Sequence, residues 1–380
     1  MNHTRPNNKP HHINKIKMEN TWNFTPVPTN KVDMKYDIDK LLCQEMPTEY
    51  LKDRLRILKA MNNYVNPEYL VELERSENKI KCDKLNFISI NSNCIEVLSR
   101  FFKNYPSRSC DYSIGGILMW ADYFDYKMAI HDSTLFIKGY DNELGSYIYY
   151  FPLGPMDKNK AIALIKRDAS NNNGSSIIVS NFETLGSDTN SQINDDRFIY
   201  QNWKEYIYDI EKFIHFSGKK MEKKRNHLNY FIRNYPHYTI EQIKLENIQE
   251  LIEFTLKFEQ GHIDSQLFKY ESEQTCKVLS CYQIYPFEGI LIRYNGYIIG
   301  YTLGEKIGDT FFVHIEKGDT GFQGIYQALS SHMAQFIQNE YPEVVLLNRE
   351  EDMGYESLRK SKESYHPSLF INKKLQILTL

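Results

Sequence analysis

Residues 310–324 read TFFVHIEKGDTGFQG, and this stretch decides the fold. Its apolar start predicts a buried strand over Thr310–Ile315, which leads into the glycine-bearing turn Glu316-Lys317-Gly318-Asp319. A helix is predicted over Phe322–Asn339, and a second apolar strand over Val344–Leu347. A strand, a helix and a second strand in this order are typical of a parallel α/β unit.

The same order of elements occurs twice in the chain. Upstream of residue 310 the pattern predicts strands over Gly289–Arg293 and Tyr297–Leu303, joined by the hairpin signal Asn295-Gly296. An earlier copy is predicted as strands Met128–Ile130, Thr134–Lys138 and Tyr147–Phe151, helix Lys158–Lys166 and strand Ser176–Val179. We therefore expect two similar α/β domains, each with its own mixed sheet.

The remaining segments set the domain boundaries. Residues 1–30 carry Pro, Asn and His without periodicity and are predicted to be a flexible tail, and leucines near a 3.6-residue period predict a small helical extension over residues 31–84. The two domains are expected at 85–215 and 216–380. The material between the two copies is predicted to be helical over Trp203–Arg233, Thr239–Phe258 and Ser265–Tyr282.

The composition limits the class of protein. Hydrophobic residues make up 41% of the 380 residues and charged residues 25%, which is an ordinary globular balance, and the net charge of -3 does not favour polyanions as a whole. No apolar run approaches the roughly 20 residues of a membrane-spanning helix, and residues 1–18 are basic and polar, without the apolar centre expected of a secretory signal. The six cysteines lack the spacing of a zinc site, so we expect a cytoplasmic protein without a bound metal.

A basic segment, SGKKMEKKRNH, spans residues 217–227 and is a candidate phosphate-binding helix. A solvated helix face is the alternative, because most charge runs are only that. Lys224 and Arg225 fall on the apolar stripe of this helix, where a cation needs a partner or a cavity. The candidate residues for binding tRNA or phosphate are Lys219, Lys220, Lys224 and Arg225.

A second candidate group surrounds the strand over Thr310–Ile315. Strict alternation would place His314 and Glu316 on one face, where they could act as a base and its orienting partner or simply as a hydrogen-bonded pair. The helix start that follows carries Gln323 and Tyr326, and free N–H groups at such a start suit an anionic or carbonyl ligand.

A third group, NREEDMG at residues 348–354, follows the strand over Val344–Leu347. Ligands gather at the carboxyl ends of strands in open α/β sheets, and acids beside an arginine suit an ammonium group. The alternative is an acidic helix N-terminus favoured by the helix dipole. The candidate residues are Asn348, Arg349, Glu350, Glu351 and Asp352, with Arg359 and Lys362 one to two helical turns further on.

These motifs, in this order, resemble the family named for the C-terminal domain of phosphatidylglycerol lysyltransferase. The resemblance runs from about Leu85 to the end of the sequence. It is carried by RSCDYS at residues 108–113, Trp120 with Tyr123, FPLG at 151–154, SGKK at 217–220, KKRNH at 223–227, HIEK at 314–317, NREEDMG at 348–354 and LRKSK at 358–362. Such proteins are similar to Fem-type aminoacyltransferases, and the resemblance implies two GNAT-like acyltransferase domains in tandem.

The resemblance also implies a reaction, the transfer of an aminoacyl group from a charged tRNA to a hydroxyl or amine. The acceptor would be a lipid, a peptide or a small molecule, and aminoacyl-tRNA would be a co-substrate, with no further cofactor. His314, Glu316 and Asp352 are the expected catalytic residues; the acids Glu350 and Glu351 would bind the substrate ammonium. Two alternatives remain: an acyl-CoA-dependent N-acyltransferase, and a non-catalytic module that binds tRNA or a protein partner.

Overall fold

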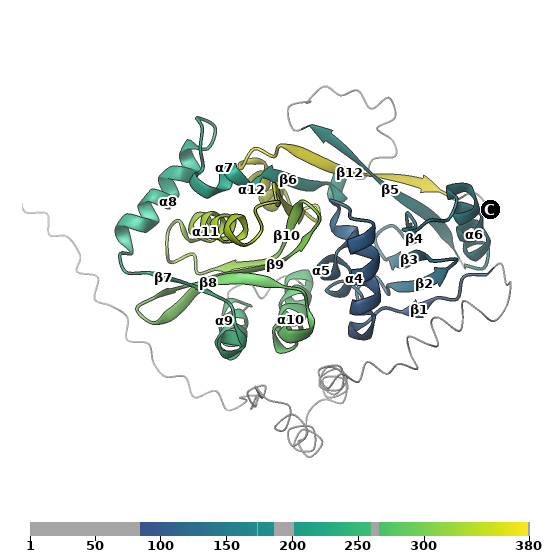
Figure 1. The fold of residues 1–380 in the computed structure, drawn as a ribbon, viewed down its shortest axis with the longest axis horizontal. Helices are drawn as coiled ribbons and strands as arrows, with labels where there is room; N and C mark the ends of the chain where they lie inside the picture. The colour runs from purple at the N-terminus through teal and green to yellow at the C-terminus, as the bar shows by residue number, and fades with distance from the viewer. Residues whose placement is uncertain (1–83, 173, 186–200, 260–265, 379–380) are drawn as a thin grey trace, which may run out of the picture.

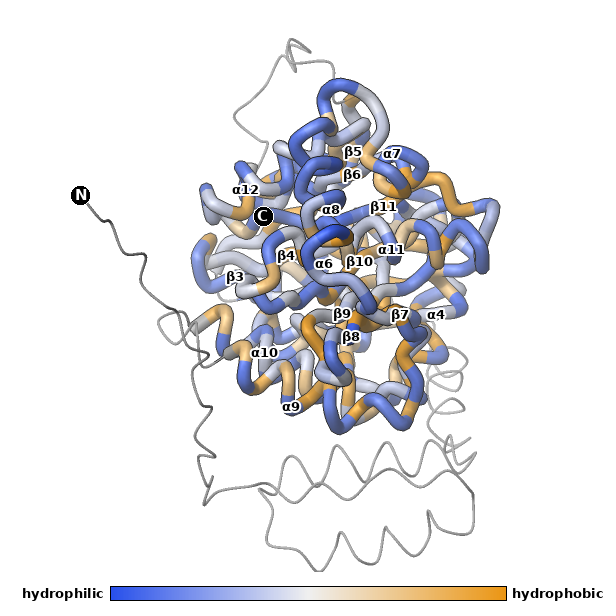
Figure 2. Tube along the Cα trace, turned by 90° about the vertical axis from the view of Figure 1, so that its left-hand side faces the viewer, coloured by the Kyte–Doolittle hydropathy of each residue, from blue (hydrophilic) through white to orange (hydrophobic). Residues whose placement is uncertain are grey.

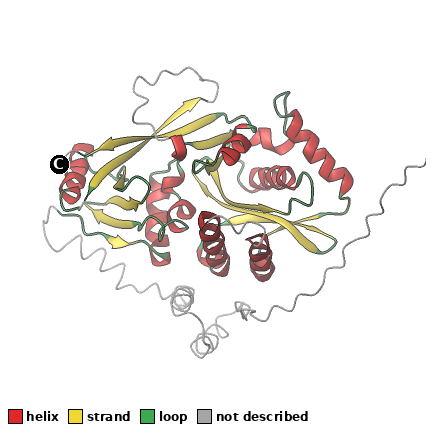
Figure 3. Ribbon diagram, turned by 180° about the vertical axis from the view of Figure 1, so that it is seen from behind, coloured by secondary structure: helices red, strands yellow, loops and turns green. Residues whose placement is uncertain are grey.

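The computed structural model describes residues 84–172, 174–185, 201–259 and 266–378. The described strands form one sheet of twelve, with helices on both faces (Figures 1 and 3). The predicted α/β class with a duplicated order of elements is therefore confirmed. The predicted tail over residues 1–30 and all but residue 84 of the predicted helical extension lie outside the described residues.

The first half of the molecule contains the predicted first copy. Its elements are β1 (Ile88–Ser89), α4 (Ile95–Asn104), α5 (Ile114–Leu118), β2 (Lys127–His131), β3 (Thr134–Asp141), β4 (Ser146–Tyr150), α6 (Lys158–Ala169), β5 (Ser175–Leu185), β6 (Glu205–Asp209) and α7 (Ile210–His215). Strands β2, β3 and β4 are antiparallel neighbours, and β5 runs parallel to β4 after the crossover through α6.

The second half repeats this arrangement. Its elements are α8 (Glu222–Asn234), β7 (Thr239–Gln242), α9 (Ile248–Glu259), α10 (Gln266–Ser280), β8 (Glu288–Tyr294), β9 (Tyr297–Ile307), β10 (Thr310–Gly318), α11 (Ile325–Glu340), β11 (Leu346–Glu351), α12 (Glu356–Glu363) and β12 (Leu369–Ile377). Asn295 and Gly296 have φ angles of 51° and 82°, so the predicted hairpin turn is confirmed. Strands β10 and β11 are parallel, as their order around α11 requires.

The two halves exchange a strand each. Strand β6 pairs with β11 of the second half, whereas β12, which follows β11 and α12, pairs with β5 of the first half; β6 and β12 also pair with each other. The expectation of a separate sheet in each copy is therefore wrong, and Trp203–Arg233 is not helical throughout, because it contains β6. In Figure 1, β12 runs alongside β5 across the junction of the halves.

Helices cover both faces of the sheet in the second half. Figure 1 places α9 and α10 on one face and α11 on the other. Hydrophobic and hydrophilic residues alternate along α9 in Figure 2, as expected for a helix with one buried face. The core around α9 and α10 is continuous with that of the first half through residues such as Leu251 and Ile117, and a second core surrounds α11.

Candidate active site

A pocket lies at the junction of the two halves. Its volume of about 70 Å³ is several times what one bound water molecule requires. Both halves contribute to its lining, which consists of Cys110, Asp111, Gly116, Trp120, Phe124, Tyr126, Tyr150, Trp203, Glu350, Glu351 and Met353. The pocket thus combines an aromatic wall with carboxylates, a combination that suits a cationic or amine-bearing ligand.

The aromatic wall belongs mainly to the first half. The Tyr126 ring stacks on Phe124 and meets Tyr150 at an angle, and the two tyrosine hydroxyls lie 2.5 Å apart. Burial raises the pKa of both hydroxyls well above the ordinary tyrosine value, so they stay neutral. This wall offers π-faces and neutral hydroxyls, and it contributes no charge of its own.

The charged side of the pocket is organised around Lys373 of β12, whose side chain is 1% exposed. Its Nζ lies 2.6 Å from Asp111 Oδ2, 2.7 Å from Glu205 Oε1 and 3.3 Å from Glu351 Oε1. Burial alone disfavours the ammonium, but these carboxylates outweigh it and raise the pKa of Lys373 well above the usual lysine value. Lys373 is therefore a permanent cation that neutralises part of an acidic cluster.

This cluster also has the composition of a metal site. Ligand atoms of Cys110, Asp111, Glu205 and Glu351 lie within 4.8 Å of one another. The ammonium of Lys373, however, already lies at hydrogen-bonding distance from Asp111 and Glu205. The lysine thus supplies the positive charge that a metal ion would otherwise bring.

The carboxyl of Glu351, in the same cluster, has a strongly raised pKa. This carboxyl has a pKa of about 8, because burial and the nearby charges of Asp111 and Glu205 raise the pKa more than Lys373 lowers it. A carboxyl that titrates near neutrality can both accept and donate a proton at working pH. Since Glu351 also lines the pocket, it has both the position and the proton affinity of a general base.

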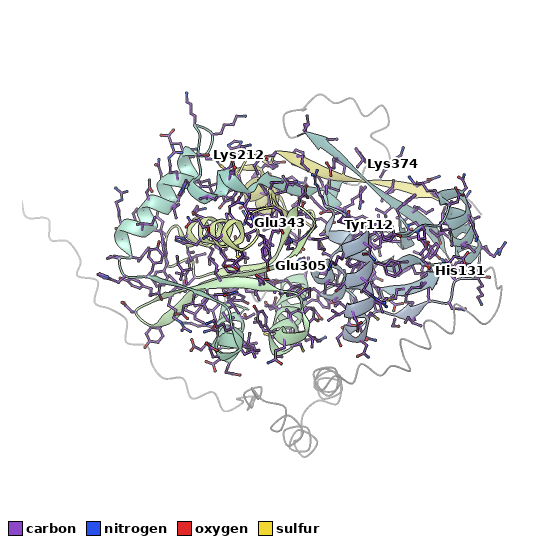
Figure 4. All side chains as sticks on the ribbon, viewed as in Figure 1. Tyr112, His131, Lys212, Glu305, Glu343 and Lys374 are labelled. Atoms are coloured by element: carbon purple, nitrogen blue, oxygen red, sulfur yellow. The ribbon has the colours of Figure 1, made fainter. Side chains whose placement is uncertain are left out.

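The second pocket carboxylate, Glu350, is held by a hydrogen-bonded chain. His314 Nδ1 lies 2.6 Å from Glu350 Oε1, and His314 Nε2 lies 2.9 Å from Glu305 Oε1. The N–H of Gly115, in α5, donates to the same Glu305 oxygen at 2.7 Å. Figure 4 labels Glu305 on the second-half side of the junction and Tyr112 across from it in the first half.

His314 is an imidazolium in this chain. Burial lowers its pKa, but the charges and hydrogen bonds of Glu350 and Glu305 outweigh burial and raise the pKa to about 9. Its side chain is 1% exposed and does not line the pocket. The geometry therefore gives His314 the position of an orienting group behind Glu350.

Strand β10 contains a bulge at His314, where the pairing with β9 shifts between Val313 and Ile315. The bulge interrupts the alternation, so His314 and Ile315 point to the same face and Glu316 to the other. The expectation that His314 and Glu316 share a face is therefore wrong. Glu316 accepts from Arg349 Nη2 at 2.6 Å and from Ser330 of α11, on the face opposite the pocket.

The end of β11 also departs from regular pairing. Strands β10 and β11 pair over only three positions, up to Phe312 and Asn348, and the pairing of β11 with β6 shifts after Asn348. Asn348 is fully buried, accepts from the N–H of Glu350 at 2.7 Å and donates to Glu205. Glu350 has a φ of 57°, in the left-handed region. This local geometry turns Glu350 and Glu351 toward the pocket.

Other residues predicted from the sequence lie away from the pocket. Asp352 is buried and bonded to Arg359 Nε at 2.7 Å and to the Tyr206 hydroxyl at 2.5 Å. Lys362 donates to the carbonyls of Arg349 and Glu351, so it fixes the backbone of the acidic segment. Gln323 is exposed at the start of α11. Tyr326 packs against the core around α11 on the opposite face, where burial and the charge of Glu316 raise its pKa to about 12.

The four basic residues predicted to bind tRNA occupy three different environments. Lys219 and Lys220 are exposed before the start of α8. Arg225 donates to the carbonyls of Phe216 and Gly218, so it closes the turn between α7 and α8. Lys224 points inward, with its Nζ 3.6 Å from the centre of the Tyr365 ring.

Several residues of this site were not predicted. Asp111 belongs to a motif of the resemblance, but no pattern distinguished it as a charged member of a pocket. Lys373 lies in a strand that pairs with the other half, and its inward direction follows from that pairing. Glu205 and Glu305 lie in strands whose other residues are mostly apolar. The sequence signal that could have identified them is a single acidic residue within an apolar run.

The described helices include none with the length and apolar content needed to cross a bilayer.

One family model matches most of the chain. The family described as phosphatidylglycerol lysyltransferase, C-terminal, matches residues 102–373. A conserved protein of unknown function from Bacteroides thetaiotaomicron is 25% identical, with a TM-score of 0.65 over 76% of this chain and 99% of that one.

Two further solved structures share the fold. The C-terminal domain of a putative lysylphosphatidylglycerol synthetase from Agrobacterium fabrum is 12% identical, with a TM-score of 0.52, and L-PGS from Bacillus licheniformis is 14% identical, with a TM-score of 0.51. Each comparison covers 75% of this chain and 92% of the other. An uncharacterized protein from Mycoplasmoides gallisepticum is 28% identical over 182 residues, which span 48% of this chain and 58% of that protein.

Proposed function

The chain belongs to the phosphatidylglycerol lysyltransferase C-terminal family, and on this premise we propose that it transfers an aminoacyl group from a charged tRNA to a hydroxyl or amine acceptor. The observation that carries the proposal is the pocket at the junction, where carboxylates from the second half face an aromatic wall from the first. An aminoacyl ester brings an ammonium group beside the carbonyl that reacts. A pocket with acids and π-faces suits that group.

In this proposal Glu350 binds the ammonium of the aminoacyl group, because His314 and Glu305 hold its carboxylate in place. Glu351 accepts the proton of the acceptor hydroxyl or amine as that atom attacks the ester carbonyl. The bond between the carbonyl carbon and the ribose oxygen then breaks, and Glu351 returns its proton to the leaving ribose oxygen. Lys373 holds Asp111 and Glu205 in place through its ion pairs without taking part in the proton transfer.

One observation disfavours the acyl-CoA alternative. The loop before α11 would have to receive the pyrophosphate of a coenzyme A donor, and such a site needs free backbone N–H groups. Here Asp319 Oδ1 accepts the N–H of Gly321 at 2.8 Å, so a carboxylate occupies that loop. The negative charge repels a pyrophosphate and therefore disfavours a coenzyme A donor.

The test is a transfer assay with tRNA that carries radiolabelled amino acids, in which protein-dependent loss of label from tRNA is followed with lipid, peptide and amine acceptors. We expect Glu350→Gln and Glu351→Gln to reduce the rate by about 10²-fold or more, in the range of general acid–base and charge effects. Glu356→Gln, at an exposed position of α12, is the matched control and should leave the rate unchanged. Turnover of acetyl-CoA in place of aminoacyl-tRNA would contradict the proposal, and absence of any transfer with retained tRNA binding would favour a non-catalytic module.

A further inference from the structure

A second charged cluster lies on the face of the sheet opposite the pocket, between α8, α11 and α12. Lys224 of α8 places its Nζ 3.6 Å from the centre of the Tyr365 ring, and Arg349 of β11 places its Cζ 4.9 Å from the same centre. Two cations thus share one aromatic ring. Tyr365 is itself fixed, because its hydroxyl accepts from Gln327 of α11 at 2.8 Å.

The negative charge in this cluster does not match the positive charge. Glu316 is bound by Arg349 Nη2 at 2.6 Å and accepts from Ser330 through its other oxygen, so its carboxylate is already occupied. Among the described residues none offers the ammonium of Lys224 a carboxylate or a hydrogen-bond acceptor. Burial, together with the charge of Arg349, lowers the pKa of Lys224 to about 8.

An ammonium that is partly buried beside a guanidinium is costly unless an anion accompanies it. The residues around Lys224 indicate which kind of anion would bind there. The exposed Lys219 and Lys220 precede Lys224 on the same segment, and the carbonyl of Lys220 lies 3.1 Å from His366, the neighbour of Tyr365. The cluster is therefore the inner end of a basic surface, which is the arrangement that tracks a chain of phosphates.

We infer that Lys224 and Arg349 bind one phosphate of a nucleic-acid strand that lies along the start of α8, with the Tyr365 ring fixing the position of both cations. This inference rests on the proposed tRNA donor and adds a defined phosphate position to it. It also distinguishes Lys224 from its neighbour Lys223, which is exposed. On a diffuse positive surface the two lysines would contribute equally to tRNA affinity, whereas at a defined phosphate site Lys224 contributes more than Lys223.

The experiment measures binding of deacylated tRNA by fluorescence anisotropy over a range of salt concentrations. Lys224→Met should raise Kd at least tenfold and reduce the slope of log K against log[salt] by about one. Lys223→Met is the matched control and should raise Kd less than threefold. Inorganic phosphate should compete with tRNA on the wild type and on Lys223→Met, but not on Lys224→Met.

One further variant and a stability measurement keep the test independent of folding and of the transfer reaction. Lys224→Arg retains a cation and should keep most of the affinity, while Lys224→Met should leave Tm unchanged or slightly raised because a desolvated charge is removed. Equal effects of Lys223→Met and Lys224→Met would overturn the inference. So would Lys224-dependent binding to phosphatidylglycerol vesicles without tRNA binding. Loss of transfer activity alone would not, since no step of this measurement requires transfer.

Discussion

The two halves of the molecule use the same order of elements but differ at the parallel strand pair. In the first half β4 and β5 pair over five positions, from Ser146 with Ser175 to Tyr150 with Val179. In the second half β10 and β11 pair over three positions and are then interrupted by the bulge at His314 and the irregular end of β11. Where the strands stay paired the sheet forms an apolar wall. Where β10 and β11 part, the irregular backbone directs Glu350 and Glu351 into the interior. The pocket lies between these acids and the aromatic wall of the first half.

From this comparison we expect substitutions on the charged side of the pocket to reduce stability most. The largest loss is expected for Lys373→Met. Removing the ammonium leaves Asp111 and Glu205 buried without a counter-charge, so the free energy of unfolding should fall by about 3–5 kcal/mol. Urea denaturation followed by tryptophan fluorescence measures the change. The control is Lys374→Met at the next, exposed position of β12, labelled in Figure 4, which should change stability by less than about 0.5 kcal/mol. Similar losses for the two variants would contradict a special role for the buried lysine.

The next effect is a pH dependence of stability that belongs to His314. Its pKa is near 6.5 in the unfolded chain and about 9 in the folded chain, so its contribution is complete below pH 6.5 and disappears as pH rises through about 9. The difference corresponds to on the order of 3 kcal/mol. Denaturation curves at pH 6, 7.5 and 9 should show this decline in the wild type and a flatter profile in His314→Gln. A decline that persists unchanged in the variant would assign it to other groups.

A smaller effect is expected at the contact between the halves. A Cβ at Gly115 would lie 2.4 Å from Cδ2 of the His314 ring, and that ring is held on both sides, so it cannot move away freely. Gly115→Ala should therefore destabilise the protein by about 1–3 kcal/mol, as other overpacked cores are destabilised.

A double-mutant cycle checks the cause of that effect. In a His314→Ala background the added methyl group has room, so Gly115→Ala should cost much less there. Equal costs in the two backgrounds would mean that the strain lies in the backbone of α5 and not in the contact with His314.

The smallest effect is expected on the aromatic wall. Trp120 lines the pocket and packs against Tyr123 and Tyr270. If it only provides a π-face, Trp120→Leu should raise KM for the aminoacyl donor about two- to fivefold, from a cation–π energy of about 0.5–1 kcal/mol, and leave kcat nearly unchanged. Trp120→Phe should retain most of the affinity. A large fall in kcat instead would place Trp120 among the residues that contact the reacting atoms.

The duplicated order of elements could be predicted because each unit is local. The hairpin at Asn295-Gly296 and the helix after Lys158 are specified by neighbouring residues, and their bounds differ little from those expected. Strand β12 was not predicted, because its partners lie in residues 177–185 and 205–207, far away in the sequence. Strands that pair across so many residues leave no recognisable pattern in the local sequence.

The site was predicted only where local order was sufficient. Glu350 and Glu351 line the pocket, and they were identified by their position after a strand. The faces of His314 and Glu316 were predicted incorrectly because alternation holds only in a regular strand. The bulge at His314 arises from the pairing of β10 with β9, which the local sequence does not reveal. Lys373 could not be found because its importance depends on carboxylates from three other segments.

The exchange of β6 and β12 has a consequence for how the chain reaches its folded state. Ile177 pairs with Ile377, so the first half of the sheet keeps an open strand edge until a segment some 200 residues later in synthesis is available. Contacts of such sequence separation slow folding, because a long loop must close before they form. An early folding product therefore carries an exposed edge that can pair with another copy of itself. Cutting the chain between the halves would leave two fragments with complementary edges, each of which requires the other to complete its sheet.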